Sequence, residues 1–325
     1  VVDSGVDVVI LTTPPHFRPV QLAYAVDAGK HVFAEKPVAV DAPGVRSVMK
    51  TVEKSQAQGL GLIVGFCWRY SNGERATFAQ LEQGAVGEIR AAYTTYNTGV
   101  LWKKPRRPGW SDMEFQLRNW LHFHWLTGDH IVEQAVHSID KMSWAMGDAL
   151  PLRATAVGGR QARKGPESGN VWDHFGVTYD YPNGARGFHM CRQIAGCSND
   201  NSDYILGARG ICRINGWTPL HEITGENPWK YEGPGNDMYQ TEHDEFFASI
   251  RAGKPRNDGE RVAHSTMLAI LGRMAAYTGQ TVTWEQALHS TERYGPGSYA
   301  WTDLPVEPVP VPGVTKLQLP AEGGK

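Results

Sequence analysis

Residues 6–12 (VDVVILT), 31–34 (HVFA) and 61–66 (GLIVGF) are short apolar runs rich in β-branched residues. Runs of this length and character are typical of strands buried on both faces of a parallel sheet. Two helices are predicted between these runs. The first covers residues 17–28 and is ended by Gly29, and the second runs from its N-cap Asp41 to about residue 58. This alternation predicts an α/β fold with a doubly wound parallel sheet.

The phosphate-binding half of such a domain is not found in the sequence. No G-x-G-x-x-G follows a first strand, and no acidic residue stands at the distance expected for ribose binding. We therefore interpret residues 1–66 as the C-terminal part of a dinucleotide-binding Rossmann domain that lacks its first βα units, roughly sixty residues. Residues 67–325 are predicted to form a complete second domain.

The second half of the chain changes character. Residues 153–157, 175–181, 185–193 and 204–214 are strand-like, and Pro182-Asn183-Gly184 is a strong hairpin signal. Residues 237–250 and 259–278 predict two helices, the second ended by Gly279. This pattern predicts an antiparallel sheet of the kind that carries substrate pockets or subunit contacts, followed by a proline-rich extended tail.

Composition excludes several classes of protein. The 32 Lys+Arg and 34 Asp+Glu residues give a formal charge of −2, which argues against a nucleic-acid partner. No apolar run reaches the roughly 18 residues needed to cross a membrane. The 4 cysteines form no CxxC pair, so they predict free thiols rather than a metal site. We expect a soluble protein, cytoplasmic by default, or periplasmic if a preceding segment carried an export signal.

Glu35-Lys36-Pro37 follows the second predicted strand. Ligands of open α/β sheets bind outside the carboxyl ends of the strands, and a lysine there can exchange a proton with a substrate hydroxyl. The alternative is a solvated surface lysine.

Thr12, Thr13, Pro14 and His16 follow the first predicted strand. Such a loop can lie against a flat ring such as nicotinamide, or it can be a structural turn.

His130, Glu133, His137 and Asp140 are spaced three, four and three residues apart. On one continuous helix they would share a face, because steps of three and four residues stay in register. His137 is then the natural acid or base, and Glu133 could orient it. An exposed polar face is one alternative and a zinc site is another.

Trp120, His122 and His124 form an aromatic cluster ahead of that segment. Tryptophan faces and histidine donors suit sugar rings, although aromatic core packing is an equally good interpretation. The sequence has no GxSxG, no phosphate loop and no HExxH, so hydrolase and kinase readings lose their support.

Together, the TTPPHFRP, AGKHVFAEKPVAVD, GFCWRY and EQAVHSID segments, in this order, resemble the Gfo/Idh/MocA oxidoreductase family. The resemblance implies a Rossmann domain, a second domain built on an open, mainly antiparallel sheet, and NAD or NADP as cofactor. It implies that Lys36 and His137 are catalytic, His137 being the histidine of a D-x-x-x-H pattern, with Asp140 three residues later. It places the cofactor beside Thr12, Thr13, Pro14, His16, Glu35, Lys36 and Arg69.

One departure concerns Glu133, which stands where the family usually has Asp. The additional methylene puts the hydrogen bond from its carboxylate to the substrate or His137 in question.

The predicted function is hydride transfer between nicotinamide and a sugar or cyclitol hydroxyl carbon. Lys36 and His137 would handle the proton, Glu133 and Asp140 would orient them, and Trp120, His122, His124, Lys36 and His137 would bind the substrate, without a metal. Alternatives are an NAD-dependent glycoside hydrolase that oxidises transiently, and a non-catalytic sugar-binding or subunit-interaction protein. The resemblance also predicts a homo-oligomer formed through the sheet of the second domain.

Overall fold

The computed structural model describes residues 2–321 and contains two sheets. The smaller sheet is parallel, in the order β1-β2-β3, with bounds β1 (Val8–Leu11), β2 (His31–Ala34) and β3 (Leu62–Val64). Helices α1 (Arg18–Asp27) and α2 (Ala42–Ala57) connect its strands. The Asp41 side chain accepts a hydrogen bond from the Gly44 backbone N–H at 2.8 Å, so the predicted N-cap is confirmed.

Among the described residues, the larger sheet has nine strands, and its one parallel pair is β4 with β7. The prediction of a mainly antiparallel second sheet is therefore confirmed. Its spatial order is β11-β10-β9-β8-β4-β7-β6-β5-β12. The strands are β4 (Ile89–Thr98), β5 (Arg153–Gly159), β6 (His174–Asp180), β7 (Arg186–Gln193), β8 (Ser202–Gly207), β9 (Gly210–Asn215), β10 (Leu220–Gly225), β11 (Trp229–Lys230) and β12 (Val282–Thr283).

One strand prediction was wrong. Residues 204–214 do not form a single strand, because the chain reverses between β8 and β9. Gly207 and Gly210 permit this close turn: a Cβ at Gly207 would lie 2.1 Å from the Val86 carbonyl oxygen, and one at Gly210 would lie 2.6 Å from that of Thr224.

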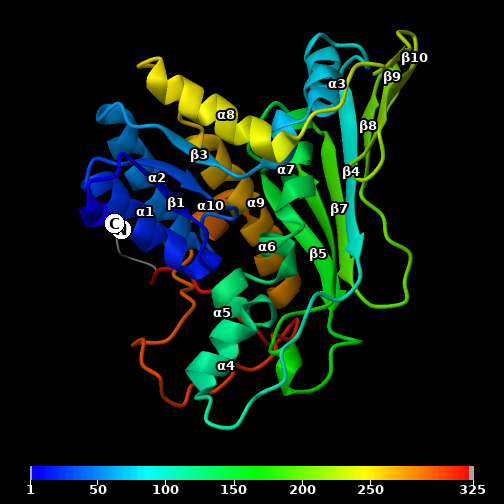
Figure 1. Cartoon of the computed structure of the whole chain (residues 1–325). Coiled ribbons are helices and arrows are strands. Elements are labelled where there is room, and N and C mark those ends of the chain that lie inside the picture. Colours follow the sequence, from blue (N-terminus) through cyan, green and yellow to red (C-terminus); the bar gives the residue numbers. More distant parts are fainter. Residues whose placement is uncertain (1, 322–325) are drawn as a thin grey trace.

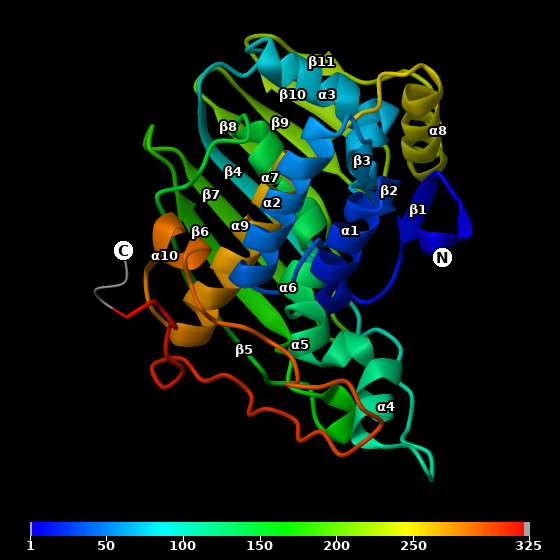
Figure 2. The same cartoon turned by 90° about the vertical axis from the view of Figure 1, so that its left-hand side faces the viewer.

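Most of the remaining helices lie on one side of the larger sheet, whereas α8 (Met238–Arg251) covers the small sheet, where Phe246 packs in one cluster with Phe33 and Ile63 (Figures 1 and 2). The longest, α9, packs against β5 and β6, and Gly279 ends it in the left-handed conformation, as predicted. These helices are α3 (Asn72–Glu82), α4 (Asp112–Arg118), α5 (His124–Thr127), α6 (His130–Glu133), α7 (Val136–Ala145), α8 (Met238–Arg251), α9 (Gly259–Thr278) and α10 (Trp284–Leu288). None of the helices within the described residues is long and apolar enough to cross a membrane.

The two sheets share one hydrophobic core. Val32 of β2, Val45 of α2, Leu271 of α9 and Phe175 of β6 belong to the same buried cluster. Residues 256–258 also extend the small sheet, because the Leu62 N–H donates to the Arg256 carbonyl and the Asp258 N–H donates to the Leu62 carbonyl, both at 2.9 Å. The second half of the chain therefore packs against the first and stabilises it. The predicted domain boundary at residue 66 stays a prediction.

Candidate active site

The carboxyl edge of the small sheet is tied together by Arg18, at the start of α1. Its guanidinium donates to the Thr13 carbonyl at 2.6 Å and to the Pro37 carbonyl at 2.8 Å, so the loops after β1 and β2 are held side by side. Burial lowers the pKa of Arg18 to about 10, which leaves the side chain charged at neutral pH. Sequence reasoning missed this residue, because nothing in its local pattern shows that it bridges two strand ends.

Lys36 lies at the end of β2, as predicted, and its amine meets Glu133 from the other part of the chain. Nζ donates to the Glu133 carbonyl oxygen at 2.5 Å and to Oε1 of the same residue at 3.1 Å. Both side chains are 13% exposed, so the pair is open to a ligand on one side. In this structure the carboxylate of Glu133 thus lies on Lys36.

His137 lies in the first turn of α7, four residues after Glu133. Its ring contacts Phe66 at the end of β3, with centroids 5.9 Å apart, and Trp68, at 5.2 Å. Nδ1 is buried without a hydrogen-bond partner among the described residues. Burial lowers the pKa of His137 well below its ordinary value of 6.5, and the charge of Lys36 lowers it further. The imidazole is therefore neutral at pH 7 and able to accept a proton.

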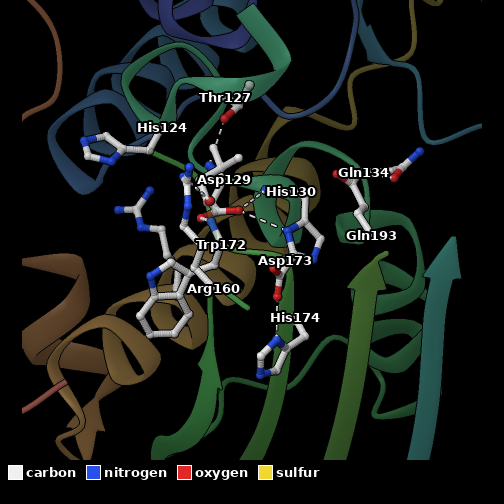
Figure 3. Close-up of polar contacts among 12 residues, drawn as sticks. His124, Thr127, Asp129, His130, Gln134, Arg160, Trp172, Asp173, His174 and Gln193 are labelled. Atoms are coloured by element: carbon white, nitrogen blue, oxygen red, sulfur yellow. Dashed lines mark hydrogen bonds and ion pairs between the residues drawn. The ribbon is translucent and has the colours of Figure 1, made fainter. Parts of the chain in front are cut away.

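The prediction that residues 130, 133, 137 and 140 share one face of one helix was wrong. The chain forms two short helices, α6 and α7, and leaves regular helical geometry at Gln134 (φ −110°, ψ −52°). His130 points away from the site into a buried cluster around Asp129 (Figure 3). Gln193, at the end of β7, donates a hydrogen bond from Nε2 to Gln134 Oε1 at 2.6 Å and so fixes the Gln134 side chain.

Asp129 explains why His130 turns away. Its carboxylate accepts from the His130 backbone N–H at 2.6 Å, contacts the His130 ring nitrogen at 3.0 Å, and accepts from the Trp172 N–H at 2.7 Å. Burial alone would raise the pKa of Asp129, but these hydrogen bonds and that of the Tyr277 hydroxyl hold it below its usual value. The structure therefore does not bring His130 beside His137, as the zinc-site interpretation required. Within residues 2–321, no group of three or more His, Cys, Asp or Glu side chains is placed to hold a metal.

Asp140 and Arg69 form a buried ion pair with each other. Arg69 donates to Asp140 from Nε at 2.8 Å and from Nη2 at 3.0 Å, and also reaches Asp148 at 3.0 Å. Ser265 and Arg261 complete the surroundings of Asp140, at 2.7 and 3.3 Å. Despite burial, these cations hold the pKa of Asp140 to about 2. The structure therefore engages Asp140 with arginines rather than with Lys36, and its charge acts on His137 by raising the pKa of that ring.

Thr12 and Thr13 follow β1 at the carboxyl edge. Thr12 is exposed, and the Thr13 hydroxyl donates to Gln21 Oε1 at 2.5 Å. Pro14 precedes the short 3₁₀ turn Pro15–Phe17 that leads into α1. Whether this loop contacts a ligand stays a prediction.

His16 and Glu35 flank that loop on different sides. His16 Nε2 lies 2.7 Å from the Tyr299 hydroxyl, and its ring packs edge-on against Trp125. The Glu35 carboxylate lies against Gly65, where an added Cβ would be 3.0 Å from Oε2. Whether either side chain contacts the cofactor stays a prediction.

The aromatic cluster predicted to bind sugar lies elsewhere. His122 is buried between the Trp102 carbonyl, 3.0 Å from its Nε2, and Arg163, 2.9 Å from its Nδ1, and burial lowers its pKa to about 4. His124 Nε2 contacts Glu307 in the C-terminal tail at 2.7 Å. Trp120 packs on a separate apolar cluster. The structure does not bring these three residues to Lys36, because their partners belong to the core beneath the tail.

Other aromatic residues take the place beside His137. Trp68 lies 6.2 Å from Tyr96, and Tyr96 lies 5.9 Å from Trp217 of the β9–β10 turn, measured between ring centroids. Burial raises the pKa of Tyr96, and the nearby charge of Glu133 raises it further. Sequence reasoning left Trp217 unassigned, because only the order of strands in the large sheet brings it to this place.

Family models match both parts of the chain. One, described as an oxidoreductase family with an NAD-binding Rossmann fold, matches residues 1–66, and the GFO/IDH/MocA C-terminal domain matches residues 75–213. The chain belongs to the Gfo/Idh/MocA family. The predicted family, fold class and nicotinamide-dinucleotide cofactor are thus confirmed, and the chain is a member of an NAD-binding oxidoreductase family.

Several known proteins are similar to this family member. Trans-1,2-dihydrobenzene-1,2-diol dehydrogenase of Mus musculus is 28% identical over 281 residues, which is 82% of this chain and 75% of that protein. The 2,7-anhydro-N-acetylneuraminate hydratase of Escherichia coli is 27% identical over 179 residues, 55% of this chain and 44% of that protein. The solved aldose-aldose oxidoreductase of Caulobacter crescentus superposes with a TM-score of 0.71 at 20% identity, covering 87% of this chain and 81% of that one, and it shares the fold.

The residues of the small sheet suit the nicotinamide end of the cofactor. Three parallel strands end at one edge, where Thr12, Thr13 and Lys36 lie, and the buried Arg18 fixes the loops that carry them. This edge is where open α/β sheets bind ligands. His137 of α7 lies at the same edge, where its ring contacts Phe66 after β3.

Proposed function

We propose that this protein transfers hydride between NAD(P) and a hydroxyl-bearing carbon of a sugar or cyclitol, with Lys36 and His137 handling the proton. The observation that carries the proposal is the meeting of Lys36, Glu133 and His137 at the carboxyl edge of the small sheet. When bound, the nicotinamide accepts or donates the hydride. The residues of the chain then have to bind the hydroxyl, hold it in place and move its proton.

Each of the three residues has a distinct task. The Lys36 amine, held by two oxygens of Glu133, donates its remaining hydrogen to the substrate oxygen. The neutral His137 accepts the hydroxyl proton during oxidation and returns it during reduction. Glu133 is a positioning residue, because its contact in the structure is with the Lys36 amine.

The test is whether reduced cofactor accumulates. With the full-length protein, NAD or NADP, and a panel of hexoses and inositols, we expect NADH or NADPH to rise in proportion to substrate consumed. A glycoside hydrolase that oxidises, eliminates, adds water and reduces again would cleave a glycoside without net NADH, and that result would replace the dehydrogenase assignment. The hydratase named above supports keeping this second candidate.

The pH dependence of oxidation follows from His137. Because burial and Lys36 lower its pKa, the ring stays neutral as pH falls through 6.5 and becomes protonated only at a lower pH. We therefore expect kcat/KM for oxidation to fall only well below pH 6.5, which gives the pH profile an acid limb there. A His137→Asn variant should lose most of its rate, and its pH profile should lack this acid limb. An acid limb at or above pH 6.5 would contradict the role given to His137.

We also infer a homo-oligomer formed through the large sheet. Its face opposite the helices carries exposed apolar side chains from four strands, namely Val157, Met190, Tyr204, Leu206 and Ile211. A contiguous exposed apolar patch of this kind is typical of a subunit contact. We expect light scattering to give more than one chain per particle, and Met190→Arg to lower that number. A monomer with the native sequence would rule the contact out.

A further inference from the structure

A second cavity adjoins the candidate active site, and Trp68 belongs to both. The cavity measures about 340 Å³ and lies between α3, the β9–β10 turn and residues 231–238. Trp68 lines it and also contacts His137, while Trp217, another lining residue, contacts Tyr96. A substrate held at Lys36 and His137 therefore has this cavity as its neighbour, and its volume is within the range of small-molecule sites, about 300–1,000 Å³.

The aromatic wall of the cavity is fixed in place. Trp217 is 45% exposed, and the turn that carries it is held by the Asn215 side chain, whose Oδ1 accepts from the N–H groups of Trp217 at 2.9 Å and Thr218 at 3.1 Å. Tyr231 adds a second ring to the lining. Rings positioned in this way present apolar faces on which the C–H face of a sugar can lie.

Two polar side chains of the lining have buried atoms with unused hydrogen-bonding capacity. Glu74 is 1% exposed and His221 is 9% exposed, and neither Glu74 Oε2 nor His221 Nδ1 has a hydrogen-bond partner among the described residues. Buried polar atoms are normally satisfied, so these two call for a ligand or water that supplies donors and acceptors. Burial raises the pKa of Glu74 to about 7, so this carboxyl can donate as well as accept near neutrality. Hydroxyl groups match both side chains.

The side chains that line the cavity favour a neutral ligand. No Lys or Arg is found among the described residues that line it. Lys141 packs on the lining residue Trp68, with Nζ 4.0 Å from the ring centroid, but it is buried and paired with Asp203. A phosphate or diphosphate would therefore find no charged side-chain donor among these lining residues, and such donors make its strongest hydrogen bonds.

We propose that this cavity is a subsite for the second, neutral sugar unit of a glycoside whose first unit is held by Lys36 and His137. The proposal deepens the proposed function and rests on it for the position of the first unit. It names the substrate class as a disaccharide or a related neutral glycoside, in preference to a free monosaccharide or a nucleotide sugar.

Calorimetric titration of the full-length, cofactor-loaded protein tests the subsite without using turnover. The ligands are cellobiose, maltose, lactose and melibiose, compared with glucose, galactose and UDP-glucose. We expect at least one disaccharide to bind about tenfold more tightly than its monosaccharides, a difference of about 1.4 kcal/mol in binding free energy. Trp217→Ala should remove that gain, Trp217→Phe should keep most of it, and Trp301→Ala, a matched change at an exposed residue of the tail, should leave it intact.

The outcomes separate the two proposals. If no disaccharide gains affinity, or if Trp217→Ala leaves the gain unchanged, the subsite is wrong whatever the enzyme does. Tighter binding of UDP-glucose than of every disaccharide would overturn the neutral class of ligand. If a disaccharide binds through Trp217 but no sugar yields NADH or NADPH, the subsite stands and the dehydrogenase function fails.

Discussion

A Lys36→Met variant of the full-length protein is expected to lose about 10²- to 10⁴-fold in turnover, the usual contribution of a positioned acid or base. Methionine keeps an unbranched side chain of similar length but has no N–H group. The substrate oxygen then loses its donor, and the carboxylate of Glu133 loses the cation that holds it at 3.1 Å. Binding of NADH should change little, because most contacts of a dinucleotide lie away from this amine. Initial rates and an NADH titration measure the two effects separately.

A second lysine, at the opposite end of β2, provides the control. Lys30 directly precedes β2 and so lies at the amino end of the strand that has Lys36 at its carboxyl end. Because ligands bind at the carboxyl ends of such strands, Lys30→Met should keep turnover within about twofold. Should Lys36→Met retain more than about a tenth of the native rate, the amine would not be the group that handles the substrate hydroxyl.

The His137 ring offers a further check on the same variant. The Lys36 charge is the second of the causes that lower the His137 pKa, after burial. Removing that charge should raise the pKa, and an NMR titration of the ring would detect the change in native and variant protein. This readout depends on the distance between the two groups and does not need turnover.

The local features of the sequence predicted the local features of the fold. The three apolar runs became β1, β2 and β3, Asp41 capped α2, and Gly279 ended α9. In each case the decisive residues are neighbours in the chain, so propensity and capping chemistry are enough. The strand over residues 204–214 failed for the opposite reason, because the close approach of Gly207 to Val86 comes from a distant segment.

Sequence reasoning could predict only those residues of the candidate site that follow the ends of strands. Lys36 and Thr13 come directly after strands, whereas the break between α6 and α7 depends on Asp129 and on Gln193, which is 59 residues from Gln134. Helical spacing alone could not reveal that His130 would turn to Asp129. Likewise, aromatic composition marked His122 and His124 as sugar ligands, although their partners in the fold are an arginine and a residue of the C-terminal tail.

Lys141→Ala is expected to lower the free energy of unfolding by about 3–5 kcal/mol, the usual cost of removing one partner of a buried ion pair. Lys141 is 1% exposed and bonds to Asp203, which is fully buried, with Glu74 at 4.0 Å. Without the amine, two buried carboxyl groups have no cation, and Trp68 loses the ammonium packed on its ring. Urea unfolding followed by circular dichroism measures the change. The matched control is Lys54→Ala, which breaks an exposed pair with Asp27 and should cost less than about 1 kcal/mol.

The loss of unfolding free energy in Lys141→Ala should also depend on pH, and the direction of that dependence shows whether the unpaired carboxyl groups cause the loss. Burial already raises the pKa of Asp203 to about 6 in the presence of the lysine, above its ordinary 3.8. Without the lysine the folded-state pKa rises further, so the buried carboxyl is protonated at low pH and its ionisation opposes folding as pH increases. The deficit relative to the native protein should therefore be small near pH 4 and grow toward pH 7.

Asp203→Asn in the Lys141→Ala background should recover part of the deficit at neutral pH, because it removes one of the two uncompensated charges. A deficit that is independent of pH would show that lost packing around Trp68, rather than the unpaired carboxyl groups, carries the effect.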